Sequence, residues 1–357
     1  GSVERILKIL VGHGAVEDIM IDAHPHIGTN KLPKIIAKMR ENILASGGKI
    51  HFDCRVEDLI IKGAKIKGVV DQNKNKILGQ SVILATGHSA RDIFHLLDRH
   101  KILIEAKSFA LGVRIEHPQP IIDKAQYHCN VRSKYLPAAS YKFVQQVNGK
   151  GVFSFCMCPG GHIVPSATTP GEVVVNGMSA STRSSRYANS GMVVAIETGD
   201  LEAYTKHGEL AGLVFQQEME KMAWEAGGKT QAAPAQRMVD FTNGKFSNTL
   251  NECSYIPGIN SAPLHELLPS IIGNRLQEGF KTFGRKMKGY YTNEANILGV
   301  ESRTSSPVRI PRDEVLLSHP QVHNLYPCGE GAGYAGGIVS AAIDGERCAE
   351  AIHKSLA

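Results

Sequence analysis

The alternation of apolar and polar residues predicts a helix and several strands in the first third of the chain. From Thr29, the segment TNKLPKIIAKMRENILASGG repeats apolar residues every three or four positions. This spacing predicts an amphipathic helix that is capped by Thr29 and ends at Gly47-Gly48. The apolar run Ser81–Thr86 is typical of a buried strand, and Ser89 and Asp92 have the spacing of a capping box that opens a helix near residues 90–100. Three runs have strand character: residues 49–56, 58–71 and 76–87.

Between residues 106 and 295 the pattern changes to apolar strands separated by Gly, Pro and Ser. The strand-like runs are FALGVRIEH, YKFVQQV, GVFSFCMC, EVVVNGMSA and GMVVAIE. Helical periodicity follows at residues 208–227 and 263–287. Because helices do not regularly separate these strands, we expect an inserted α+β domain with an antiparallel or mixed sheet.

Composition and charge exclude several classes of protein. The chain has 357 residues, of which 42% are apolar, so wholesale disorder is not expected. The net charge of +6 is small and its lysines and arginines are scattered, which favours neither a nucleic-acid groove nor a membrane surface. No apolar run approaches membrane-spanning length, no signal peptide is recognisable, and the seven cysteines are an odd number. These features predict a soluble, cytoplasmic protein with free thiols.

A glycine-rich segment near the C-terminus carries the first sign of ligand binding. Residues 331–336, GAGYAG, match G-x-G-x-x-G after a predicted strand at Leu325–Cys328. Only one helix fits after the motif, so the second strand and the acidic residue of a dinucleotide fingerprint are missing. Glycines this dense still let the backbone approach a ligand, and the next helix directs its free amides at it. The glycines concerned are Gly329, Gly331, Gly333, Gly336 and Gly337.

A flavin suits this loop, because its N1–C2=O edge becomes negative on reduction and a helix N-terminus stabilises negative charge. Tyr334, inside the loop, is a candidate to stack on the ligand or to hydrogen-bond with it. The alternative is a β–α turn that binds nothing.

Two motifs resemble those of the glutathione-reductase-like flavoproteins. LATGHSARD at 84–92 resembles their A-T-G turn, and YPCGEGAGYAGGIVSAAIDG at 326–345 resembles their closing flavin motif. An ordered set of further motifs is similar to a bacterial family of FAD-dependent dehydrogenases, the NAD(P)/FAD-dependent oxidoreductases, over nearly the whole chain. These motifs are HIGT at 26–29, FALGVRIEHP at 109–118, FCMCPGG at 155–161, NGMSAS at 176–181 and ESRTSSPVRIPRD at 301–313.

The resemblance implies a cofactor, FAD, and roles for individual residues. Glu330 would meet the ribityl hydroxyls, and Gly337 and Ile338 would present backbone amides to the isoalloxazine edge. The A-T-G turn would pass beside the cofactor with its three residues, Ala85, Thr86 and Gly87.

The implied fold is α/β, an incomplete FAD-binding Rossmann-like domain interrupted by the inserted domain. Residues 1–105 and 296–357 would form the FAD-binding part, and residues 106–295 the insertion, which faces the substrate. Flavoproteins of this type open with a strand, G-x-G-x-x-G and a helix, none of which is present; residues 12–17, GHGAVE, lack the third glycine and a preceding strand.

We therefore expect a C-terminal piece of a longer flavoprotein. The missing diphosphate loop would remove several charge-assisted hydrogen bonds of about 1.5–3 kcal/mol each, so FAD should bind weakly or not at all.

Thiols and arginines are the candidate catalytic groups. A strand would place the side chains of Cys156 and Cys158 on one face, with their Cα atoms roughly 6.5–7 Å apart, so a disulfide between them would be strained. One interpretation is a redox pair, and the alternative is two small core residues beside a turn. The pair offers too few ligands to define a zinc site, and no metal is predicted. Arg303 and Arg309 suit a carboxylate, a carbonyl or the negative edge of reduced flavin, or else ion pairs with Glu301, Asp313 or Glu314.

The function that follows is an FAD-dependent oxidoreductase that passes a hydride through flavin N5. NAD(P)H is a possible electron donor, and the small-molecule substrate cannot be read from the sequence. An RNA-modifying flavoprotein and a non-catalytic binding or regulatory module are the alternatives. No Ser-His-Asp order, Walker loop or base-reading motif is recognisable, which argues against a hydrolase, a nucleoside triphosphatase or sequence-specific nucleic-acid binding.

Overall fold

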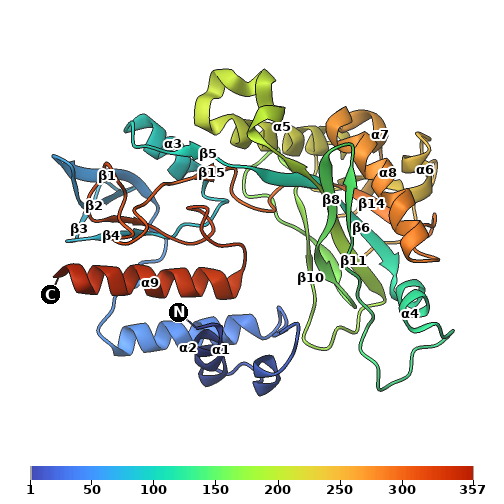
Figure 1. Ribbon diagram of the computed structural model, residues 1–357, viewed down its shortest axis with the longest axis horizontal. Coiled ribbons are helices and arrows are strands. Elements are labelled where there is room, and N and C mark those ends of the chain that lie inside the picture. Colours follow the sequence, from blue (N-terminus) through green and yellow to red (C-terminus); the bar gives the residue numbers. More distant parts are fainter. Residues whose placement is uncertain (1, 357) are drawn as a thin grey trace.

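Two lobes make up the computed structural model, which describes residues 2–356 (Figure 1). The first lobe combines the N-terminal and C-terminal stretches, and the second contains the middle of the chain. The helices are α1 Val3–Gly12, η1 Glu17–Met20, α2 Leu32–Ala45, α3 Arg91–Arg99, α4 Gln119–Tyr127, η2 Thr198–Leu210, α5 Ala211–Ala226, α6 Met238–Thr242, α7 Leu264–Leu267, α8 Ser270–Lys286 and α9 Ile338–Leu356. The strands are β1 Val56–Lys62, β2 Lys65–Asp71, β3 Lys76–Leu78, β4 Val82–Leu84, β5 Glu105–Ala106, β6 Phe109–Pro118, β7 Val144–Val147, β8 Lys150–Cys158, β9 His162–Pro165, β10 Val175–Met178, β11 Tyr187–Ile196, β12 Ala233–Arg237, β13 Ile259–Ser261, β14 Asn296–Glu301, β15 Val308–Arg309 and β16 Leu325–Pro327.

A seven-stranded sheet forms the centre of the second lobe. Its strand order is β13-β12-β14-β6-β11-β8-β7. The β12–β13 pair is parallel and the other pairs are antiparallel, so the prediction of a mixed sheet is confirmed. The central strand β6 is buried on both faces. On one face Leu111, Val113 and Ile115 are fully enclosed in a core that includes Phe280 and Phe283 of α8.

The first lobe contains a three-stranded antiparallel sheet and a separate parallel pair. The sheet has the order β1-β2-β3, and β4 pairs in parallel with β16, with Val82 opposite Leu325 and Leu84 opposite Pro327. The connection between these two parallel strands contains the whole second lobe. The prediction of a buried strand at Ser81–Thr86 is wrong in part. Leu84 is buried but Ile83 is 39% exposed, because β16 is the one strand that pairs with β4 in residues 2–356.

Several local predictions differ from the structure in their boundaries. The helix expected from Thr29 begins at Leu32 with proline in its first turn, and Thr29 does not cap it. The Thr29 hydroxyl instead donates to the carbonyl of Ser179 in the other lobe. The run 49–56 is irregular as far as Val56, because Asp53 has a left-handed backbone with φ of 50°.

Helices near 90–100, 208–227 and 263–287 are present as α3, α5 and the α7–α8 pair. The capping box expected from Ser89 and Asp92 is absent, because Ala90 is the N-cap of α3 and makes no side-chain bond. Among residues 2–356, no helix combines the length and the apolar character that a bilayer crossing requires.

Candidate functional site

Two glycine-containing turns meet where β4 and β16 end. The amide of Cys328 donates to the carbonyl of Leu84 at 3.0 Å, so the two chains stay hydrogen-bonded at the point where the two turns begin. Gly87 has φ of 74°, and a Cβ on Gly331 would lie 2.5 Å from the Gly87 carbonyl oxygen. The two backbones are therefore in direct contact, and no side chain fits between them. Ligands of α/β sheets bind outside the carboxyl ends of parallel strands, which is where these turns lie.

The glycine-rich loop leads from β16 into α9. Its turn is closed by hydrogen bonds from the amide of Gly333 to the carbonyl of Glu330 and from the amide of Tyr334 to the carbonyl of Gly329, both 3.0 Å. In the described part of the chain, the amides of Gly337 and Ile338 have no acceptor, and both residues are exposed. Figure 1 shows this end of α9 directed at the space between the lobes. The free amides and the helix dipole therefore favour negative charge at this position.

A buried ion pair beneath the loop fixes its position. Arg312 binds Asp344 at 2.6 Å, and the second carboxylate oxygen of Asp344 accepts the amide of Gly329 at 2.8 Å. Burial acts to raise the pKa of Asp344, but the hydrogen bonds from Arg312 and Gly329 outweigh it and lower the pKa. Sequence reasoning passed over this pair, although Asp344 lies within the closing motif and Arg312 within the preceding one.

Other charged residues surround the same loop. Glu330 lies 3.4 Å from the imidazole of His88, which follows the A-T-G turn. The guanidinium groups of Arg309 and Arg312 lie 5.1 Å and 3.8 Å from the centre of the Tyr334 ring. Tyr334 therefore stacks on arginines of its own chain, which leaves less of the ring for a ligand than the sequence suggested.

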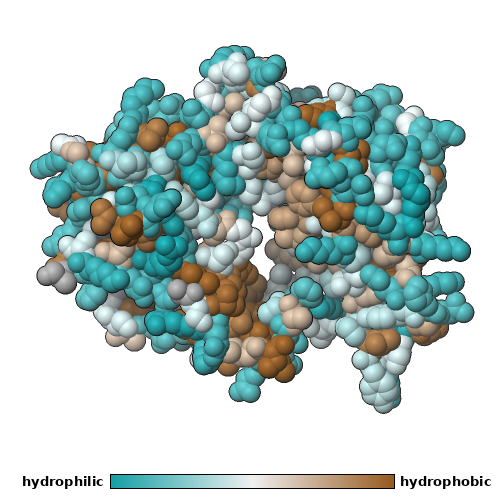
Figure 2. Space-filling view, viewed as in Figure 1, coloured by the Kyte–Doolittle hydropathy of each residue, from teal (hydrophilic) through white to brown (hydrophobic). Residues whose placement is uncertain are grey.

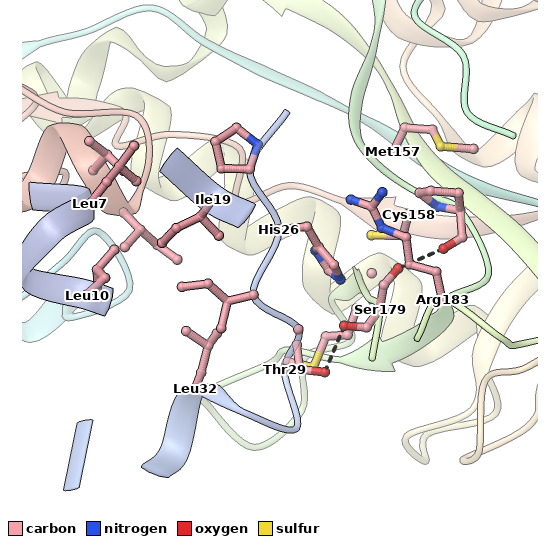
Figure 3. A pocket seen from close by; sticks show the side chains of 18 residues that line it. Leu7, Leu10, Ile19, His26, Thr29, Leu32, Met157, Cys158, Ser179 and Arg183 are labelled. Carbon is pink, nitrogen blue, oxygen red and sulfur yellow. Dashed lines mark hydrogen bonds between the residues drawn. The ribbon is translucent and has the colours of Figure 1, made fainter. Parts of the chain in front are cut away.

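A cavity of about 280 Å³ lies beside the start of α9 (Figure 3). Figure 2 shows a hollow between the two lobes, bordered in part by apolar side chains. The cavity is lined from both lobes by Leu7, Leu10, Ile19, Pro25, His26, Ile27, Gly28, Thr29, Leu32, Met157, Cys158, Pro159, Gly177, Met178, Ser179, Arg183, Ile338 and Val339. Its apolar wall and few polar groups are typical of a small-molecule pocket.

The structure brings the Cys156–Cys158 pair to this region, but not as a regular strand. Phe155 pairs with Gly191 and Cys158 with Asn189, so a bulge interrupts the alternation at Cys156, whose φ is 43°. The predicted two-residue period at this point is therefore wrong. Cys158 lines the cavity together with Ile338 and Val339 at the start of α9, which places this thiol on the same cavity as the end of the glycine loop.

Both thiols are held in the neutral form. The Cys156 thiol reaches the surface, but the surrounding protein removes most of its water, and this desolvation raises the pKa of Cys156 to about 11. Burial also raises the pKa of Cys158. We expect iodoacetamide to modify Cys156 at pH 8 much more slowly than in the urea-unfolded chain, where a thiol has a pKa of about 8.5. The modification rate should rise from pH 8 to pH 11 as the thiolate forms.

Peptide mapping by mass spectrometry would measure these rates for Cys156 in folded and unfolded protein. Rapid modification of folded protein at pH 7 would contradict the neutral thiol and restore the reactive redox pair.

A buried arginine that the sequence analysis missed lies beneath the thiols. Arg114 on β6 pairs with Glu301 on β14 at 3.0 Å, and both side chains are enclosed. Its guanidinium also donates to the carbonyl of Cys156 at 2.6 Å and contacts the sulfur of Cys158. Burial raises the pKa of Glu301 despite this partner. The strand-like run FALGVRIEH could have indicated Arg114, because a charged residue inside an apolar strand requires a partner of opposite charge.

Arg303 does not reach the cavity in the structure. Its guanidinium binds Glu220 at 2.9 Å and Glu172 at 3.0 Å within a buried cluster that also contains Arg91. The partners predicted for it, Glu301, Asp313 and Glu314, are therefore wrong. Direct roles of Cys156, Cys158, Arg303 and Arg309 in catalysis stay predictions, as do the flavin contacts of the two turns.

Comparison with known proteins assigns the family. Residues 108–304 match the family described as FAD-dependent protein, C-terminal domain-like. An uncharacterized protein of Clostridium beijerinckii is 40% identical over 351 residues, covering 97% of this chain; the chain spans 65% of the length of that relative.

Two solved structures share weaker similarity. CtdE in complex with FAD gives a TM-score of 0.33 at 10% identity, over 89% of this chain and 59% of that one. Tetracycline destructase Tet(51) gives a TM-score of 0.25 at 12% identity, and the match covers 56% of this chain and 40% of that one. Neither is close enough to support an argument about fold or function. Residues 108–304 carry the assignment by themselves: the chain belongs to the family of FAD-dependent proteins with this C-terminal domain-like region.

Proposed function

We propose that this chain supplies the flavin-facing part of an FAD-dependent oxidoreductase. The observation that carries the proposal is the pair of touching glycine turns, followed by the exposed amides of Gly337 and Ile338 beside a cavity. A planar, electron-rich ring fits this surface, because the backbone is bare there and the helix end is positive. FAD, when bound, supplies hydride transfer through N5 of its ring system.

The residues of the chain would bind and orient the cofactor. The amides of Gly337 and Ile338 would hold its negative edge, and Glu330 would accept hydrogen bonds from sugar-like hydroxyls. The Arg312–Asp344 pair would keep the loop in place through the amide of Gly329. The apolar wall of the cavity would exclude water from the reacting atoms.

We further propose that the diphosphate and adenosine half of FAD is held by residues outside this chain. The Clostridium relative is longer than this chain, and the parallel pair β4–β16 would be part of an incomplete Rossmann-like sheet. In this division, residues 1–105 and 296–357 face the flavin and residues 106–295 face the substrate. FAD should then bind the 357-residue chain weakly.

Flavin absorbance near 450 nm tests both proposals. We expect a longer chain that includes the preceding module to purify yellow and to lose this absorbance when a donor such as NADH or NADPH is added without oxygen. The 357-residue chain should purify colourless. Stoichiometric FAD on the short chain would contradict the division of the cofactor site, a colourless longer chain would contradict the flavoprotein, and flavin that no donor reduces would favour a binding module.

A further inference from the structure

Arg183 is a charged residue that lines the cavity and forms no ion pair in the described part of the chain. Among the cavity-lining residues there is no aspartate or glutamate. In residues 2–356, the Arg183 guanidinium forms no hydrogen bond and no ion pair, and its Nε is shielded from water. The guanidinium is partly buried and has no counter-charge, so an anion that enters the cavity would supply both a counter-charge and an acceptor for the shielded Nε.

The backbone holds Arg183 in place rather than leaving it on a loose loop. Its amide donates to the carbonyl of Ala180 at 3.0 Å, and its φ of 47° fixes a left-handed turn. The turn packs directly on Gly160, where an added Cβ would meet the carbonyl oxygen of Arg183. Figure 3 shows the guanidinium directed toward the space between His26 and Cys158. The side chain is therefore presented to the cavity by a fixed turn.

The opposite wall of the cavity is aliphatic. It is formed by residues from α1, η1, α2 and the start of α9: Leu7, Leu10, Ile19, Leu32, Ile338 and Val339. Ile338 is 63% exposed at the end of α9 where the flavin is proposed to bind. A ligand that fills the cavity must therefore combine an apolar body with a negative group at one end.

We propose that the cavity binds a hydrophobic monocarboxylate, whose carboxylate pairs with Arg183 and whose hydrocarbon chain lies against the aliphatic wall. The planar fork of arginine matches a carboxylate through two parallel hydrogen bonds. This ligand deepens the proposed function, because it names the substrate class for the site beside the flavin. Its binding to the cavity is a property of the chain alone and requires no flavin.

Binding of octanoate and of its neutral amide, octanamide, to the 357-residue chain tests this inference. The two probes share the hydrocarbon and differ in charge. We expect octanoate to bind at least tenfold more tightly than octanamide, measured by calorimetry or by ligand-observed NMR. Arg183→Gln should abolish this preference. Arg186→Gln is the matched control, because Arg186 is exposed, pairs with Glu252 and does not line the cavity.

A second variant guards against a folding defect in Arg183→Gln. Ile338→Glu changes a largely exposed side chain at the cavity mouth, so the fold should persist. The added carboxylate should weaken octanoate at least tenfold and octanamide less. Equal affinity of the native chain for the two probes, or an unchanged preference in Arg183→Gln, would overturn the inference.

The outcomes separate this inference from the proposed function. A longer chain that is colourless but whose octanoate preference depends on Arg183 would refute the flavoprotein and leave the carboxylate site standing. A yellow longer chain that binds both probes equally would refute the carboxylate site alone.

Discussion

Glu220→Gln should lower the free energy of unfolding by about 3–5 kcal/mol, the cost of breaking a buried ion pair from one side. Glu220 on α5 is fully buried and binds Arg91 at 2.6 Å and Arg303 at 2.9 Å. Burial acts to raise the pKa of Glu220, but the hydrogen bonds from Arg303 and Arg91 lower it, so the carboxylate is charged at neutral pH. Removing its charge leaves two arginines that share Glu172.

Urea unfolding followed by circular dichroism would measure this loss. Glu225→Gln is the matched control, because Glu225 lies on the same helix with an exposed side chain, and its change should stay within about 0.5 kcal/mol. Equal stability of Glu220→Gln and Glu225→Gln would show that the cluster contributes little.

The ion cluster also connects the two lobes. Arg91 begins α3 shortly after the A-T-G turn at residues 85–87, whereas Glu220 and Arg303 belong to the second lobe. Its loss should therefore shift the A-T-G turn relative to the cavity as well as destabilise the fold. Arg303 therefore belongs to the contacts that join the two lobes, and its role in catalysis stays a prediction.

Gly331→Ala should separate the two glycine turns and abolish flavin retention in the longer chain. The new Cβ would meet three backbone atoms of Gly87, the nearest at 2.5 Å, and backbone cannot move aside as a flexible side chain can. Overpacking of this kind costs about 1–3 kcal/mol, so the chain should still fold. The readout is the ratio of absorbance at 450 nm to absorbance at 280 nm in the purified protein.

Gly345→Ala is the control for this substitution. Gly345 lies in α9 with no atom within 4 Å of an added Cβ, so flavin content should be unchanged. Full flavin content in Gly331→Ala would show that the contact between the turns has no part in cofactor binding.

Local patterns in the sequence determined a large part of the elements. Three- and four-residue spacing located α2, α5 and α9, and apolar runs without intervening helices indicated the mixed sheet. The helix α3 was expected from a capping box that the structure does not contain. The density of glycine between residues 329 and 337 indicated a bare backbone before a helix. These features depend on a residue and its near neighbours, so a single sequence contains them. The glycine loop and the thiol pair were also found in this way, although the bulge at Cys156 was not.

Only the tertiary structure decided which charges pair and which remain free. Arg303 binds Glu220 and Glu172 rather than the acids near it in sequence, and Arg114 finds Glu301 across two adjacent strands. The sequence did not indicate that Arg183 lacks an ion pair, because this is recognised only when the acidic residues are placed in space. A buried charge must have a partner of opposite charge close to it in space. The separation of two residues along the sequence does not tell how far apart they lie in the folded chain.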